Sequence, residues 1–214
     1  MEVLRWLRSE GCPWDKMACA EAAWGGHWEI VRWLRSEGCP WSTGACYGAA
    51  INDHLEVLKW LRSEGCPWSE DVCSCAAEGG HLEILKWLRS KGCPWDDWTF
   101  YWAAKGGHLE VLKWLRSEGS PWDEGTCKFA ARGGHLDVLK YARENGCPWD
   151  GSTRKYAAES TREWLKENGC SQEYDDYSDD YSDEYSDDYS DDFRDDYSDG
   201  SPTPYSPASP QYSD

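Results

Sequence analysis

Five histidines recur every 27 residues and are the first side chains to consider as metal ligands: His27, His54, His81, His108 and His135. Packed helices lie about 8–10 Å apart. Two nitrogens on one zinc ion lie within about 4 Å of each other, because each bond is close to 2.1 Å. Histidines in adjacent copies are therefore too far apart to share a metal. We expect each to hydrogen-bond within a turn, and we expect no metal site.

Cysteine is the second residue type that could do chemistry. Disulfides need Cα atoms about 4.4–6.8 Å apart, which excludes bonds between equivalent cysteines of adjacent copies but leaves pairs such as Cys39 with Cys46 conceivable. Ser120 and Phe100 interrupt the cysteine series. We therefore expect buried thiols that pack as small apolar residues rather than bridges. One series lies in repeated Cys-Pro-Trp sequences: Cys12, Cys39, Cys66, Cys93 and Cys147.

The chain contains 16 tryptophans, all of them before residue 165. Exposed indoles can stack on nucleic-acid bases. Here they occupy fixed positions of a repeat that has no excess of basic residues, so we expect them to face the core and expect no nucleic-acid partner. Catalytic motifs such as G-x-S-x-G and H-E-x-x-H are absent from the sequence. The sequence thus predicts neither enzymatic activity nor a cofactor.

The repeat that carries these residues reads W-[DS]-x-x-[TAV]-C-x-x-A-A-x-G-G-H-L-E-V-L-K-W-L-R-S-E-G-C-P. Each copy predicts two short helices. The first begins after an N-cap such as Ser69 and presents the small residues Cys73, Ala76 and Ala77 on one face. The second spans roughly Leu55 to Glu64 and ends at Gly65. Twenty-seven residues cannot enclose a core, so copies must stack.

The copies divide the chain into four parts. Residues 15–149 form five repeats, residues 1–14 hold only a second helix, residues 150–170 form a degenerate capping repeat, and residues 171–214 form a tail. A start inside a second helix predicts an uncovered apolar edge. It suggests an incomplete gene product or a truncated paralogue.

The stretch A-A-x-G-G-H-L-E-V-L-K-W-L-R-S-E-G-C resembles the second half of an ankyrin repeat. The period of 27 is shorter than that family's 33, and T-P-L-H is replaced, as in Thr126-Cys127-Lys128-Phe129. The resemblance implies an all-α, ankyrin-like helical-repeat solenoid that binds a protein partner. It does not imply the family's projecting β-turn fingers, because the missing residues are those that build them.

First helices vary between copies while second helices are nearly constant. Since the resemblance places first helices on the concave side, the variable residues predict a binding surface there. Aromatic and arginine side chains often dominate interface energies. Lysines and arginines concentrate toward the C-terminal half, which predicts an acidic ligand, with the chain's own tail as one candidate; neutral drift of a solvated surface is the alternative. The candidate partner-binding residues are Tyr47, Trp98, Tyr101, Trp102, Lys105, Lys128 and Arg132.

The tail holds most of the net charge of −18: residues 171–214 contain fifteen Asp or Glu residues and one arginine. They contain no Leu, Ile, Val, Met, Trp or Cys, so we expect a disordered acidic C-terminal tail. It could solubilise the array, mimic nucleic acid or bind basic proteins. Four hydroxyl residues precede prolines and are candidate phosphorylation sites: Ser201, Thr203, Ser206 and Ser209.

The expected cellular location of the protein rests on features that the sequence lacks. It contains neither a long apolar run nor a signal region, so we expect no membrane partner and an intracellular location, cytoplasmic or nuclear. We also expect a monomer. The leading hypothesis is a non-enzymatic scaffold that binds a protein through its first helices. Two alternatives stay open: the tail is the active part and the array a spacer, or the chain is a degenerate paralogue without a partner.

Overall fold

The computed structural model describes residues 1–119 and 123–170, and these contain α-helices and no strand. The expected all-α architecture is therefore confirmed for this part of the chain. The tail, with Ser201, Thr203, Ser206 and Ser209, lies outside the described residues.

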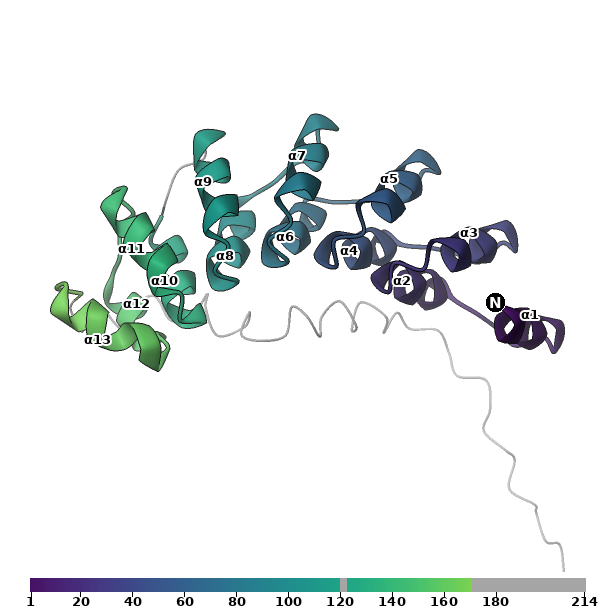
Figure 1. Ribbon diagram of the computed structural model, residues 1–214, viewed down its shortest axis with the longest axis horizontal. Coiled ribbons are helices and arrows are strands. Elements are labelled where there is room, and N and C mark those ends of the chain that lie inside the picture. The colour runs from purple at the N-terminus through teal and green to yellow at the C-terminus, as the bar shows by residue number, and fades with distance from the viewer. Residues whose placement is uncertain (120–122, 171–214) are drawn as a thin grey trace, which may run out of the picture. The chain divides into compact units, whose positions relative to one another are not determined.

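The helices form two rows, as Figure 1 shows. One row holds the first helix of each unit and the other holds the second. The first helices are α2 (Lys16–Trp24), α4 (Thr43–Ile51), α6 (Asp71–Glu78), α8 (Asp97–Lys105), α10 (Glu124–Gly133) and α12 (Gly151–Lys155). The second helices are α1 (Glu2–Ser9), α3 (Trp28–Ser36), α5 (Leu55–Ser63), α7 (Leu82–Ser90), α9 (Leu109–Ser117), α11 (Leu136–Glu144) and α13 (Glu159–Glu167).

First helices pack directly against their neighbours, α2 on α4, α4 on α6, and so on to α12. The small residues predicted for this face make the close approach possible. Cys73, Ala76 and Ala77 of α6 are each fully buried. Gly48 of α4 lies so near α2 that an added Cβ would come within 3.1 Å of Trp24. The first helices therefore form the tightest part of the stack.

Most first helices begin at the predicted N-cap. The side chain of Asp15 accepts from the backbone N–H of Met17 at 2.9 Å, and Asp150 forms a capping box with Thr153. The third unit differs, because α6 begins one residue later than predicted, with Glu70 at the N-cap position. Ser69 still accepts from the backbone N–H of Asp71, at 3.3 Å.

Each second helix buries one stripe and ends in the same way. In α5 the buried residues are Val57, Leu58 and Leu61. Gly65 follows with φ +83°; its N–H donates to Arg62 O, and the N–H of Cys66 donates to Leu61 O at 2.9 Å. This pair of bonds is a Schellman motif, which requires a left-handed residue and so explains the recurring glycine.

Apart from the exposed Trp6, the described recurring tryptophans are half-buried, so the prediction that they face the core is wrong for this series. Among all described tryptophans only Trp102 is buried. The indole of each Cys-Pro-Trp sequence packs edge-to-face on the indole of the next second helix, with centroids 5.4–6.1 Å apart. An arginine of the preceding second helix covers it at 4.0–4.4 Å. The indoles thus fill the seam between successive second helices. The described pairs are Trp14–Trp33, Trp41–Trp60, Trp68–Trp87, Trp95–Trp114 and Trp149–Trp164.

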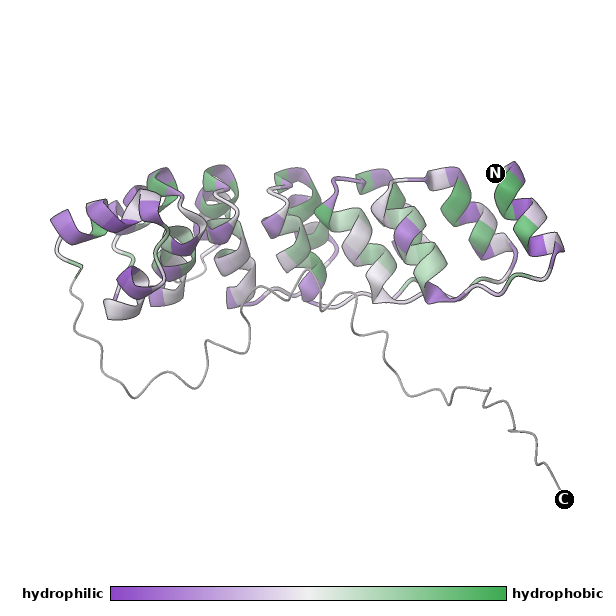
Figure 2. Ribbon diagram, turned by 90° about the horizontal axis from the view of Figure 1, so that it is seen from below, coloured by the Kyte–Doolittle hydropathy of each residue, from purple (hydrophilic) through white to green (hydrophobic). Residues whose placement is uncertain are grey.

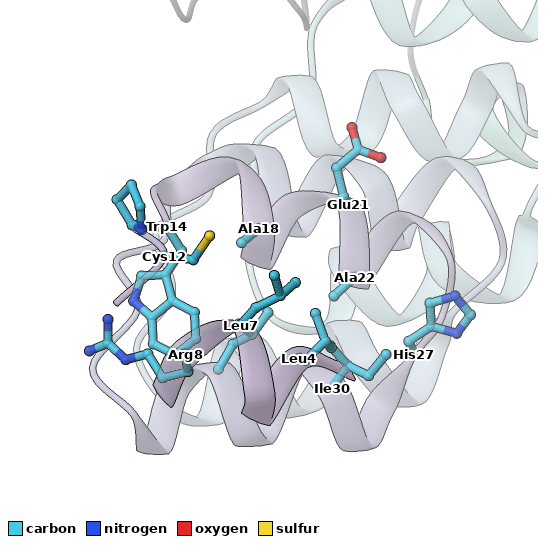
Figure 3. A pocket seen from close by; sticks show the side chains of 12 residues that line it. Leu4, Leu7, Arg8, Cys12, Trp14, Ala18, Glu21, Ala22, His27 and Ile30 are labelled. Atoms are coloured by element: carbon cyan, nitrogen blue, oxygen red, sulfur yellow. The ribbon is translucent and has the colours of Figure 1, made fainter. Parts of the chain in front are cut away.

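The two ends of the array differ. Helix α1 has no first helix of its own and leaves Val3 and Trp6 exposed at 67% and 59%, which places hydrophobic residues at this end in Figure 2. Beside it lies a cleft of about 420 Å³, lined by Leu4 and Leu7 of α1, Ala18 and Ala22 of α2, and further residues that Figure 3 labels. The apolar edge expected here is present. At the other end α13 buries only Thr161 and Leu165 and exposes a polar face.

Candidate partner-binding surface

Helices α4, α8 and α10 carry the residues predicted to bind a partner. All but one are half-buried, so part of each side chain reaches solvent. The exception is Trp102, whose side chain is only 3% exposed and faces the packed interior. We call the remaining six the first-helix strip: Tyr47, Trp98, Tyr101, Lys105, Lys128 and Arg132.

An aromatic cluster joins α8 to α10. The rings of Tyr101 and Phe129 stack in parallel with centroids 5.1 Å apart. Trp98 packs edge-on against both rings, at 5.4 Å from Tyr101 and 6.0 Å from Phe129. Sequence reasoning did not select Phe129. The sequence does mark Phe129 as a variable position, because other copies have Gly48 or Cys75 at the equivalent place in the first helix.

The two strip tyrosines tie one unit to the next through their hydroxyl groups. Tyr47 Oη lies 2.8 Å from Ser69 Oγ and donates to Asp71 Oδ2 at 3.2 Å. Tyr101 Oη donates to the carboxylate of Asp123. Burial raises the pKa of Tyr101, and the bond to Asp123 raises that pKa further. Both phenols therefore stay neutral and act as hydrogen-bond donors.

Positive charge on the strip lies over aromatic faces. The ammonium of Lys105 is 4.5 Å from the Trp102 ring centroid, and that of Lys128 is 4.9 Å from the Tyr156 ring. Such placement holds a cation in a fixed position while its N–H groups remain able to bind an anion. Burial raises the pKa of the Glu78 carboxyl, and Lys105 lowers it in part. The strip thus combines ordered aromatic rings with fixed cations.

Three of the histidines connect one unit to the next. Nε2 lies against the carbonyl oxygen of the last residue of the first helix in the preceding unit, at 3.0 Å for His54, 2.8 Å for His81 and 2.7 Å for His108. A carbonyl only accepts, so Nε2 carries the proton. The hydrogen bond expected within a turn is instead made to the preceding unit, 30 residues earlier in the chain, for these three histidines. Within residues 1–119 and 123–170, no group of three or more His, Cys, Asp or Glu side chains is placed to hold a metal ion.

Glycine and threonine complete this connection. A Cβ at Gly80, which has φ +76°, would come within 2.4 Å of the His108 ring, so the histidine needs a glycine beside it. The last unit has lost its histidine, and Thr161 replaces it by donating to Ala131 O at 2.9 Å. Sequence reasoning missed this replacement because a four-residue deletion shifts the alignment at that point.

The cysteines of the described residues are free thiols, as the sequence predicts. Four first-helix cysteines are each influenced by the cysteine 20 residues later; for example, the Cys66 sulfur and burial both raise the pKa of the Cys46 thiol. The Cys-Pro-Trp thiol in turn donates to a backbone carbonyl at the start of its own unit, at 3.1–3.6 Å. The expected burial is confirmed for these cysteines but is wrong for Cys12, which is exposed at the open N-terminal end of the array. The cysteines related by this 20-residue separation are Cys19 and Cys39, Cys46 and Cys66, Cys73 and Cys93, and Cys127 and Cys147.

Comparisons with known proteins agree with this architecture. Residues 73–116 match the family model described as ankyrin repeats (many copies). The structure is similar to the crystal structure of the human ASB11 ankyrin repeat domain, with a TM-score of 0.56, 16% sequence identity, and coverage of 73% of this chain and 85% of that one. A search of curated proteins by sequence matched none. None of the described helices has both the length and the apolar composition needed to span a membrane. The helix pairs of this chain have the ankyrin-repeat fold.

Proposed function

We propose that the array is a non-enzymatic scaffold that binds a protein partner through the first-helix strip. The observation that supports this most directly is the ordered cluster of Trp98, Tyr101 and Phe129. Rings that are already held in place lose little side-chain entropy when a partner covers them. The described residues that connect the units form no strand, so the helical surface is the part of the unit that varies and can discriminate between partners.

The partner of the strip is an acidic protein segment. Lys105 and Lys128 are anchored over rings, and Arg132 lies one turn beyond Lys128 on the same helix face. Carboxylates or phosphates of a partner can accept hydrogen bonds from such cations while its apolar groups contact the rings. Charge pairs at the rim of an interface mainly raise the association rate, and salt weakens them.

Site-specific photo-crosslinking in the full chain tests this proposal. A photoreactive amino acid replaces Lys128 on α10, and the matched control carries it at Lys140, an exposed lysine of the second-helix row. In a cell extract we expect one discrete adduct from position 128 and none from position 140, with a yield that falls as salt rises. Equal labelling at both positions, or adducts from position 140 alone, would contradict binding through the strip.

The acidic tail supports a second candidate function, because residues 171–214 carry fifteen acidic side chains against one arginine. In this alternative the tail binds basic proteins and the array acts as a spacer. An immobilised peptide of residues 171–214 retains the same partner as the full chain if the tail is the active part. If the strip is the active part, the peptide does not retain the protein that crosslinks to the photoreactive residue at position 128.

A further inference from the structure

The cleft beside α1 lies where each later unit holds a first helix. It is lined by Leu4 and Leu7 of α1, Ala18 and Ala22 of α2, and Ile30 of α3, whose side chains Figure 3 shows. One unit further along the chain, the equivalent place against α3 and α4 is filled by α2. Among the described residues no helix fills the place against α1 and α2. The cleft therefore has the position, relative to α1 and α2, that a first helix has in the rest of the array.

His27 lines the cleft in the orientation that the connecting histidines adopt. Its ring lies against the glycine two residues earlier, and the rings of His81 and His108 lie in the same way against theirs. Those two rings bond the last carbonyl of the first helix in the preceding unit. Beside Gly25 the described residues place only the His27 ring and no such carbonyl. The His27 ring is thus held in position to bond the last carbonyl of a helix that enters the cleft.

The walls of the cleft define the kind of helix that fits. Where α4 approaches α2, a Cβ on Gly48 would come within 3.1 Å of Trp24, the last residue of α2. Glu21 holds the position of Gly48 in the preceding unit and lines the cleft. The last residue of a docked helix would lie beside this carboxylate, which favours Lys or Arg there, as does the helix dipole. Close approach also requires small residues, such as the fully buried Ala76 and Ala77 of α6.

We propose that the cleft binds one α-helix of a partner protein, with small residues on its buried face and Lys or Arg as its last residue. The docked helix covers Leu4 and Leu7, and its last carbonyl accepts a hydrogen bond from His27 Nε2. The site is separate from the first-helix strip, so this proposal does not depend on the function proposed above. Exposed apolar patches commonly mark docking surfaces. The large hydrophobic residues exposed in the described part of the chain all lie at this end: Met1, Val3, Trp6 and Trp24.

The test is a methyl NMR titration of the full chain in reducing buffer. The probe is a capped peptide with the sequence of residues 123–134, which carries the small face of α10 and Arg132; a Cys127→Ser change keeps it from oxidising. We expect the methyl signals of Leu4 and Leu7 to shift until the site is saturated, while those of Leu165 at the other end do not. Ala130→Glu in the peptide should weaken binding at least about tenfold, because it buries a charge.

A His27→Phe chain should bind the same peptide about fivefold more weakly, the effect of one neutral hydrogen bond. Isolated short helices are only marginally stable in water, so a covalent form of the probe provides a second measurement. A copy of residues 123–135 placed directly before Met1 restores the 27-residue register. We expect this extension to raise the midpoint of thermal unfolding and to abolish the shifts caused by free peptide. The same extension with Ala130→Glu in the copy should do neither.

Three results would overturn the proposal. The first is that neither the free peptide moves the Leu4 and Leu7 signals nor the extension raises the unfolding midpoint. The second is that the Ala130→Glu peptide, or the His27→Phe chain, binds as tightly as the original pair. The third is a dimer of the chain alone in sedimentation that the peptide does not dissociate, because the occupant of the cleft would then be a second copy.

Discussion

The same position of the repeat is exposed to solvent at the N-terminal end of the array and buried at the C-terminal end. Leu7 of α1 is half-exposed beside an open cleft, whereas Leu165 of α13, at the equivalent position, is fully buried. Between them Leu34, Leu61, Leu88 and Leu115 are all buried. The contribution of such a leucine to the stability of the array thus depends on whether a neighbouring helix covers it, because a single unit cannot enclose its own apolar stripe.

The largest contrast should come from truncating the equivalent leucines at the two ends. Leu165→Ala leaves a cavity in a covered position and should lower the free energy of unfolding by about 2–5 kcal/mol. Leu7→Ala removes a side chain that already contacts solvent, and we expect a loss below about 1 kcal/mol. Urea denaturation followed by far-UV circular dichroism measures both. Equal losses would mean that α1 is covered in solution.

A smaller contrast should come from the histidines. His81→Ala leaves the carbonyl of Ile51 without its donor and should lower the free energy of unfolding by about 1–3 kcal/mol. His27 opens the array and has no preceding first helix among the described residues, so His27→Ala serves as the matched control with little expected effect. Thermal denaturation of the two variants measures the difference. A larger loss for the control would contradict the connecting role of the series.

The smallest contrast concerns the indoles. Trp60→Ala removes a half-buried ring packed against Trp41, and we expect a loss of about 1–2 kcal/mol, below the cost of a fully buried aromatic residue. Trp6→Ala should lose less than about 0.5 kcal/mol, because its ring is 59% exposed. Chemical denaturation of the matched pair decides this. If Trp60→Ala lowers the free energy of unfolding more than Leu165→Ala does, the seam between second helices, rather than the core, is the main source of stability.

The helices and their turns could be predicted from the sequence because local rules determine them. The second helix expected at Leu55 to Glu64 is α5, Leu55–Ser63, since its hydrophobic stripe, glycine and proline act over a few residues. The Gly-His turns could be predicted for the same reason. The repeating pattern also indicates that neighbours must stack.

Contacts between elements were harder to predict. Comparison of copies identifies equivalent cysteines but not which cysteines influence each other, so the effect of Cys66 on the pKa of Cys46 could not be predicted. A recurring tryptophan indicates packing but does not distinguish a core from a seam between helices. In the candidate site, the positions of Tyr47 and Lys128 on exposed faces follow from helical periodicity. The burial of Trp102 depends on the neighbouring ring of Phe129, which lies 6.3 Å away in the next unit.

The paired indoles give five of the seams between described second helices an optical probe each. Tryptophan emission responds to a stacked cation and to water, so the separation of two units should shift the spectrum at that seam alone. In a chain where phenylalanine replaces all tryptophans but one pair, the emission would report the opening of a single joint. Successive pairs, from Trp14–Trp33 to Trp149–Trp164, would then show in which order the joints of the array come apart.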